Sequence, residues 1–281
     1  MRPLRFIMDI SAMQLIVFSK LLRERSIDEL IELAQEHGFA GYDLAVRPGH
    51  PVTPDNAAVA LPEAARRMAA AGLVIPLVTG PTDLVEPDDP RSAPLLAAMD
   101  AADVRLLKIG YFRFDPSQGY WEQVDAARRK LARWAELGRA HGVVICYHTH
   151  SGPFLGLNGA GIMHLLRDQD PEGLAAYLDP GHLRVDGEPF PLALAMTRDY
   201  LRALSLKDVL LERVEQNGHG ATRRRWVPAG QGQVDWTQVF TILGQGGFDG
   251  PLSIHCEFEA APEDFARLFA AEVAFFRGVM G

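Results

Sequence analysis

Two histidines stand one residue apart at the end of the apolar run VVICYHTH, residues 143–150, and SGP follows at once. Side chains at positions i and i+2 of a strand lie on the same face. His148 and His150 are therefore expected to converge where the strand gives way to a loop. Imidazole nitrogens can bind a metal ion, and an imidazole can also act as an acid or base near neutral pH.

Titratable residues also stand at the ends of other apolar segments. These segments carry the motifs GYDLAVRPGH, RLLKIGY, LDPGH, SLKD and SIHCEFE. The residues that they place at strand ends are Arg47, His50, Lys108, Tyr111, Asp179, His182, Lys207, His255 and Glu257. Imidazole nitrogens and carboxylate oxygens converging from several strands suit a divalent cation such as Mn²⁺, Co²⁺, Zn²⁺ or Mg²⁺.

Some of these residues also have a purely structural interpretation. Asp before Pro-Gly is ordinary turn chemistry, so Asp179 could simply cap the turn DPGH. Lys207 and Asp208 could form an ion pair at the rim of the fold. The two cysteines, Cys146 and Cys256, do not make a disulfide framework and are interpreted as buried thiols.

Strand-like and helix-like segments alternate along the whole chain. The predicted strands are residues 5–10, 41–46, 74–80, 105–111, 143–150, 174–179, 201–208 and 251–258. The predicted helices are residues 26–38, 61–72, 93–104, 120–142, 161–170, 191–200, 234–247 and 262–280. This alternation predicts an α/β protein with a parallel sheet, and eight units close most naturally into a single (β/α)₈ barrel over residues 1–281.

A doubly wound open sheet is the rival architecture, but the glycine-rich phosphate turn that it would usually carry after the first strand is missing from DISAMQLIVFSK. The one long insertion, residues 209–232 after strand seven, contains four glycines and is predicted to be a lid or binding loop. In a (β/α)₈ barrel the active site lies at the C-terminal ends of the strands, where the titratable residues gather.

Composition narrows the class of protein. The 281 residues are 48% hydrophobic and 23% charged, with a net charge of −8. That acidic balance argues against nucleic acid as a partner. No apolar run reaches the roughly 18 residues of a membrane helix, and residues 1–20 are interpreted as a first strand and its loop rather than a signal peptide. A cytoplasmic protein without a membrane partner is expected.

These motifs, in this order, resemble the xylose isomerase-like TIM barrel superfamily, in particular its sugar phosphate isomerase/epimerase branch. The markers cover nearly the whole chain and are GYDLAVRPGH, YHTHSG, LDPGH, SLKD, AGQGQVDW and GPLSIHCEFE. The family commonly holds one divalent metal with a Glu, an Asp, a His and a Glu from strands five to eight. On this chain the Asp matches Asp179 and the last Glu matches Glu257, whereas the other two positions fall on His148 and Ser205.

The resemblance implies an isomerase or epimerase that moves a proton next to the carbonyl of a small keto-sugar, polyol or sugar acid. His148, Asp179 and Glu257 would hold one divalent metal ion, and Glu257, His148 and Lys207 would be catalytic. The substrate would contact His150, His182, Arg47, His50 and His255. Homodimers and homotetramers are common in such families.

Three alternatives remain open. A dehydratase of the inosose or dehydroshikimate type would use the same enolisation but expel water. A non-catalytic ligand-binding barrel that has lost its metal is kept open by Ser205. An abasic-site endonuclease would need more metal ligands and a basic groove, which the net charge of −8 disfavours.

Overall fold

A computed structural model describes residues 13–280, and its central feature is a closed parallel β-barrel. The strands follow one another around the barrel in the order β1-β10-β7-β6-β5-β4-β3-β2. They are β1 (Gln14–Phe18), β2 (Gly41–Ala45), β3 (Val74–Thr79), β4 (Leu106–Lys108), β5 (Val144–His148), β6 (Leu174–Leu178), β7 (Leu201–Leu206) and β10 (Pro251–Ile254). The predicted α/β class and the eight-stranded barrel are confirmed.

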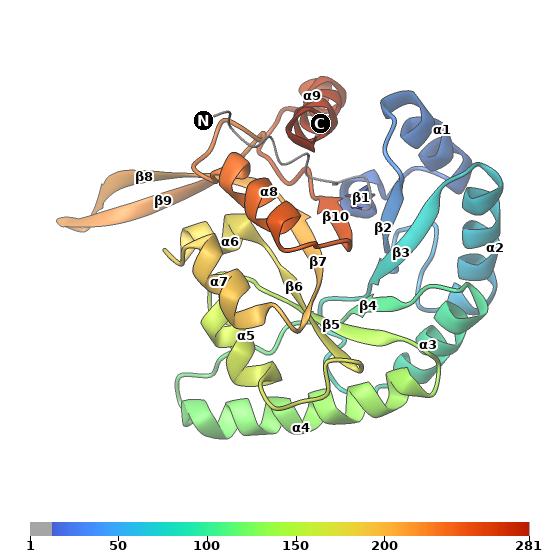
Figure 1. Cartoon of the computed structure of the whole chain (residues 1–281), viewed down its shortest axis with the longest axis horizontal. Coiled ribbons are helices and arrows are strands. Elements are labelled where there is room, and N and C mark those ends of the chain that lie inside the picture. Colours follow the sequence, from blue (N-terminus) through green and yellow to red (C-terminus); the bar gives the residue numbers. More distant parts are fainter. Residues whose placement is uncertain (1–12, 281) are drawn as a thin grey trace, which may run out of the picture.

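Helices surround this barrel and connect its strands (Figure 1). They are α1 (Ile27–His37), α2 (Ala57–Ala70), α3 (Ser92–Ala101), α4 (Tyr120–Arg139), α5 (Gly159–Leu166), α6 (Pro180–Val185), α7 (Phe190–Thr197), α8 (Trp236–Gln245) and α9 (Phe265–Met280). Helix α1 shows how local sequence sets the bounds, since Ser26 and Glu29 form a capping box and Gly38 closes the helix at φ 69°. None of the helices in the described residues combines the length and apolar character that crossing a membrane requires.

The first barrel strand differs from the prediction. The predicted strand 5–10 lies outside the described residues, and β1 is formed by QLIVF, which was assigned to the following loop. Ile16 pairs with Ser253 of β10 on one side and with Gly41 of β2 on the other. This pairing closes the barrel. Two neighbouring apolar runs, residues 5–10 and 14–18, were candidates for the first strand, and pairing with strands distant in the sequence selects residues 14–18.

Strands five and six end earlier than predicted, which changes the setting of two site residues. Strand β5 ends at His148, so His150 lies in the following loop. The predicted turn DPGH is the start of helix α6, in which Pro180 occupies the first turn. The side chain of Asp179 accepts a hydrogen bond from the backbone N–H of His182 and caps this helix.

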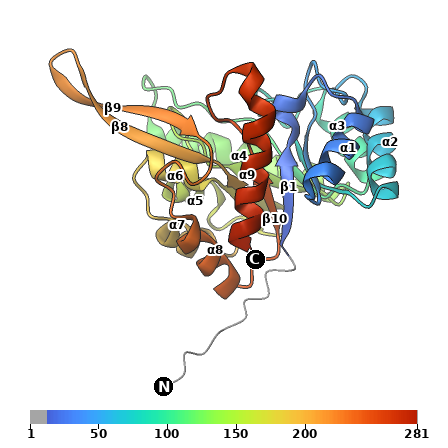
Figure 2. The same cartoon turned by 90° about the horizontal axis from the view of Figure 1, so that it is seen from above.

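The insertion after β7, predicted to be a loop at residues 209–232, is mainly a two-stranded antiparallel hairpin. Strand β8 (Asp208–Gln216) pairs with β9 (His219–Val227) along its whole length. Asn217 and Gly218 have φ angles of 52° and 79°, the geometry of a tight hairpin turn, and Asn-Gly was the sequence signal for it. Figures 1 and 2 show the hairpin extending away from the barrel as an arm.

A buried carboxyl group in α9 holds the segment that follows this hairpin. Glu272 is 2% exposed, and its Oε2 atom accepts a hydrogen bond of 2.6 Å from the backbone N–H of Ala229. Burial raises the pKa of Glu272 to about 8, although the hydrogen bond from Ala229 acts in the opposite direction. The carboxyl group is therefore protonated in the folded protein at neutral pH.

We expect this group to make stability fall as pH rises. The unfolded chain releases the proton near pH 4.5, whereas the folded chain keeps it up to about pH 8, so the stabilisation is complete below this window and lost across it. At about pH 9, Glu272→Gln should exceed wild type by about 2 kcal/mol in free energy of unfolding, with a smaller gap at about pH 5. Urea unfolding of both proteins at the two pH values measures this, with the exposed Glu263→Gln as control. Parallel pH dependence of wild type and Glu272→Gln would contradict the expectation.

Candidate active site

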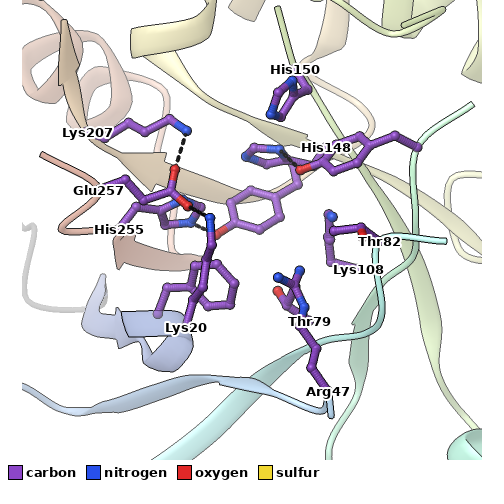
Figure 3. A pocket seen from close by; sticks show the side chains of 13 residues that line it. Lys20, Arg47, Thr79, Thr82, Lys108, His148, His150, Lys207, His255 and Glu257 are labelled. Atoms are coloured by element: carbon purple, nitrogen blue, oxygen red, sulfur yellow. Dashed lines mark hydrogen bonds and ion pairs between the residues drawn. The ribbon is translucent and has the colours of Figure 1, made fainter. Parts of the chain in front are cut away.

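A cavity at the C-terminal end of the barrel strands gathers most of the residues that the sequence singled out (Figure 3). Its free volume is about 100 Å³, which suits a small ligand. The charged and imidazole side chains that line it are Lys20, Arg47, Lys108, His148, His150, Lys207, His255 and Glu257. Because these come from six different barrel strands or the segments after them, the closed barrel is what brings them together.

Three predicted residues lie outside the lining of this cavity. Asp179 and His182 are buried behind it, next to His148 and Lys207. His50 lines a separate surface depression that shares Lys20 and Arg47 with the cavity. The structure therefore brings together all the predicted site residues except His50, which lies at the periphery.

Asp179 is the buried centre of the polar cluster behind the cavity. It is fully buried, and its Oδ2 atom accepts a hydrogen bond of 2.8 Å from the Ser205 hydroxyl. The Lys207 ammonium lies 3.4 Å from the same oxygen, and the Nε2 atoms of His148 and His182 lie at 3.6 and 3.8 Å. Asp179 therefore both caps α6 and positions the side chains that face the cavity.

The tautomer of His182 follows from its hydrogen bonds. Its Nδ1 atom accepts the backbone N–H of Ser151 at 3.1 Å, and a backbone N–H can only donate. Burial, together with Lys207, keeps the pKa of His182 well below its usual range, so the ring is neutral. The remaining proton is thus on Nε2, which faces Asp179.

The residues present do not fit the predicted metal centre of His148, Asp179 and Glu257. The Lys207 ammonium lies between the two carboxylates, 3.4 Å from Asp179 and 2.9 Å from Glu257. His182 could coordinate through Nε2 only by giving up the proton assigned there. Within residues 13–280 no group of three or more His, Cys, Asp or Glu side chains is arranged to hold a metal ion. A divalent metal ion at this site stays a prediction.

Glu257 is held between two ammonium groups. Its Oε2 atom accepts from Lys207 at 2.9 Å and its Oε1 atom from Lys20 at 2.5 Å (Figure 3). Burial opposes ionisation of this carboxyl group, but Lys207, His255 and Lys20 overcome that effect and hold its pKa well below the usual range. Burial in turn disfavours the charge on Lys207, yet Asp179 and Glu257 raise the pKa of its ammonium. Glu257 is consequently a carboxylate, and Lys207 is a cation.

His148 lies on the other side of the cavity from Lys20, in contact with Tyr111. The Tyr111 hydroxyl is 3.1 Å from His148 Nδ1, while His148 Nε2 is buried and has no hydrogen-bond partner among the described residues. Burial, with a smaller effect of His255, keeps the pKa of His148 well below its usual value. The imidazole is therefore neutral, with Nδ1 beside the Tyr111 hydroxyl and Nε2 directed toward Asp179.

The bottom of the cavity is a hydrogen-bonded chain of buried side chains. The Tyr177 hydroxyl donates to Asp43 Oδ2 at 3.1 Å and lies 3.0 Å from His255 Nε2. Thr79 donates to the other Asp43 oxygen at 2.7 Å. Burial raises the pKa of Asp43 to about 6, against the effect of these hydrogen bonds. His255 is thus fixed in orientation by residues of β2, β3 and β6.

The base of the hairpin covers one side of the site. The Trp226 ring lies 5.0 Å from the His182 ring, and the Lys207 ammonium is 4.3 Å from its centroid. Arg224 donates a hydrogen bond of 3.1 Å to the Ser151 hydroxyl, which itself contacts His182. The insertion therefore lies next to the site, although its form is a hairpin, and its role as a lid or binding loop stays a prediction.

Sequence reasoning gave no role to several residues that line the cavity. Lys20 was missed because it follows β1, whose position was predicted incorrectly. Lys108 and Tyr111 were noted at the end of strand four without an assigned function, and Tyr177 gave no signal beyond its place in an apolar run. Trp226 could not be connected with the site before the hairpin was known.

Comparisons with known proteins agree with this architecture. A family model described as "Xylose isomerase-like TIM barrel" matches residues 31–278. Among solved structures, the 3-keto-D-glucoside 4-epimerase of E. coli aligns with a TM-score of 0.72 at 16% identity, covering 95% of this chain and 99% of that one. The probable 3-DHS dehydratase of Bacillus anthracis aligns with a TM-score of 0.69 at 17% identity, covering 94% and 99%. At these identities the likeness establishes the fold.

Curated relatives match over a shorter stretch. An inosose dehydratase of Lacticaseibacillus casei is 25% identical over 148 residues, which cover 50% of this chain and 48% of that protein. An inosose dehydratase of Geobacillus thermodenitrificans is 28% identical over 147 residues, covering 50% and 49%. The chain spans about half the length of the curated relatives it matches.

Proposed function

Since the chain belongs to the xylose isomerase-like TIM barrel family, we propose that it is an isomerase or epimerase acting on a small keto-sugar, polyol or sugar acid. The reaction would move a proton at the carbon next to the substrate carbonyl. The observation that carries the proposal is Glu257, a carboxylate that lines the cavity between two ammonium groups. A proton acceptor and cations that can stabilise an enolate are thereby placed together.

Glu257 would accept the proton from carbon. Its two oxygens are held by Lys20 and Lys207, so the carboxylate is positioned before substrate binds. The same ammonium groups can approach the substrate carbonyl and stabilise the negative charge that develops on its oxygen. Stabilisation of the enolate compensates for the low basicity of a carboxylate whose pKa is depressed.

His148 would serve the second proton transfer. Its Nε2 atom is unpartnered among the described residues, and its Nδ1 atom contacts the Tyr111 hydroxyl. A proton could pass between substrate and solvent through this pair. In an isomerase or epimerase, this transfer would return a proton to a different atom or face of the enediolate. His150 and His255, which also line the cavity, would contact substrate hydroxyls.

A dehydratase is the second candidate. The inosose dehydratases at 25% and 28% identity favour it, and so does the presence of a single carboxylate in the lining of the cavity. Elimination of water needs one base and one acid. Glu257 would be the base, and the Lys207 ammonium or the Tyr111–His148 pair would protonate the departing hydroxide.

Product analysis separates the two candidates. Purified protein would be incubated with D-tagatose, D-psicose, an inosose and 3-dehydroshikimate, and products would be identified by mass spectrometry and NMR. A product of unchanged mass supports the isomerase or epimerase. A product lighter by one water molecule supports the dehydratase. Absence of any product from the whole panel and from a wider set of keto-sugars would count against both.

A further inference from the structure

Lysines are rare in this chain, and they concentrate at one place. The sequence contains four, at positions 20, 108, 130 and 207. Lys20, Lys108 and Lys207 line the cavity together with Arg47. Among the described residues, Glu257 is the one carboxylate that lines it. Although the whole chain has a net charge of −8, the active-site cavity is therefore positively charged.

Lys108 differs from the other two lysines because it has no acidic partner. It is 2% exposed, and its Nζ atom makes no hydrogen bond within the described part of the chain. Its ammonium group lies over the Tyr111 ring, 3.7 Å from the ring centroid. A buried ammonium without an ionic partner is costly, and burial, with the nearby Arg47, holds the pKa of Lys108 well below its usual range.

The carboxyl groups that act on Lys108 and Arg47 are already bound by other side chains. They are Asp43 and Glu257. Lys20 and Lys207 both bind Glu257, and the oxygens of Asp43 accept from Thr79 and Tyr177. Within the described residues neither carboxyl group forms a hydrogen bond with Lys108 or with the guanidinium of Arg47.

Arg47 lies in the same part of the cavity as Lys108, opposite Glu257 and Lys207 (Figure 3). Among the described residues its guanidinium group donates one hydrogen bond, from Nε to the Gly80 carbonyl at 3.0 Å. That bond fixes the plane of the group and leaves its two terminal nitrogens for a ligand. A planar guanidinium group beside a lysine ammonium group is an arrangement that binds carboxylate or phosphate oxygens.

We propose that Lys108 and Arg47 form a subsite for an anionic group of the substrate, a carboxylate or a phosphate monoester. The inference rests on the proposed function for the identity of the cavity as the active site. It narrows the proposed substrates, which include neutral keto-sugars and polyols, to anionic ones, namely sugar acids or sugar phosphates. Glu257, Lys20 and Lys207 would act on the carbonyl at the other end of the same small molecule.

Binding of six-carbon polyols tests the subsite without turnover. D-Sorbitol, D-gluconate and D-sorbitol 6-phosphate share a polyol chain and differ in charge, and none of them has a carbonyl to react. Dissociation constants would be measured by calorimetry and thermal shift at matched ionic strength, for wild type and Lys108→Met. We expect gluconate, sorbitol phosphate or both to bind wild type, with sorbitol much weaker, and Lys108→Met to bind the anion roughly thirtyfold more weakly.

Lys130→Met is the matched control, because Lys130 pairs with Glu86 at the surface of α4 and far from the cavity lining. It should bind the anion as wild type does. Arg47→Gln provides a second variant with the same expected loss, in case Lys108→Met does not fold. Binding by gluconate alone assigns a carboxylate, and binding by sorbitol phosphate alone assigns a phosphate.

Equal affinity for all three polyols, or full anion binding by both variants, would overturn the inference. Neither result would affect the proton-transfer proposal, which is tested by product formation from the neutral and anionic substrates of the panel. Conversely, anion binding that depends on Lys108 would stand even if no isomerised or dehydrated product were found. The two failures are therefore distinguishable.

Discussion

Replacing Glu257 with glutamine is expected to lower kcat by about 1,000-fold, which corresponds to about 4 kcal/mol of transition-state stabilisation. Glutamine has nearly the same shape, but its single amide oxygen can accept from only one of Lys20 and Lys207, and it cannot take a proton from carbon. Binding should change much less than turnover, because the cations and imidazoles that line the cavity remain. The measurement is kcat and KM for the substrate identified by product analysis.

Glu259 offers a matched control two residues further along the chain. Its side chain is exposed, and its contact with Trp226 is a backbone hydrogen bond from the Glu259 N–H to the Trp226 carbonyl. Glu259→Gln should therefore keep the activity of wild type. The melting temperature of Glu257→Gln shows whether the variant is folded. A folded variant that retained more than about a tenth of wild-type kcat would contradict the role of Glu257 as the proton acceptor.

Replacing Asp179 with alanine is expected to lower the free energy of unfolding by about 3–5 kcal/mol. The substitution removes a fully buried carboxylate that faces the Lys207 ammonium and leaves the Ser205 hydroxyl without its acceptor. It also removes the cap of α6, which accepts from the backbone N–H of His182. Urea unfolding monitored by tryptophan fluorescence gives the difference from wild type.

An exposed ion pair supplies the comparison for this prediction. Asp100 contacts Arg105 at 3.0 Å on the protein surface, and Asp100→Ala should change the free energy of unfolding by no more than about 0.5 kcal/mol. Asp179→Asn should fall between the two, because it can still accept the cap hydrogen bond. A loss below about 1 kcal/mol in Asp179→Ala would show that Asp179 does not organise the buried cluster.

Much of the barrel could be predicted because each strand carries its own local signal. The run VVICYHTH, for example, is apolar and β-branched, and its final histidines mark the end of the strand to within two residues. The first strand was not predictable in this way. Residues 5–10 and 14–18 are both short and apolar, and pairing of Ile16 with Ser253 and Gly41 is a contact between distant segments. Only the closed barrel decides between such neighbours.

The candidate site was also predictable in part from the sequence. His148, Lys207 and Glu257 could be expected to converge, because parallel strands in a barrel bring their C-terminal ends to one face. Their partners could not be expected, since hydrogen bonds depend on side-chain positions that no local pattern records. Ser205 donates to Asp179, and Lys207 lies between Asp179 and Glu257, so two of the predicted metal ligands are bound by other side chains.

Exchange of substrate hydrogen with deuterium from the solvent reports directly on proton transfer next to the carbonyl. A ketose or keto acid would be incubated with enzyme in D₂O, and the C–H next to the carbonyl would be followed by proton NMR. We expect loss of that signal with wild type and with Glu259→Gln, at a rate about 1,000-fold lower with Glu257→Gln. Conversion of a substrate without any deuterium entering at that carbon would contradict proton transfer next to the carbonyl.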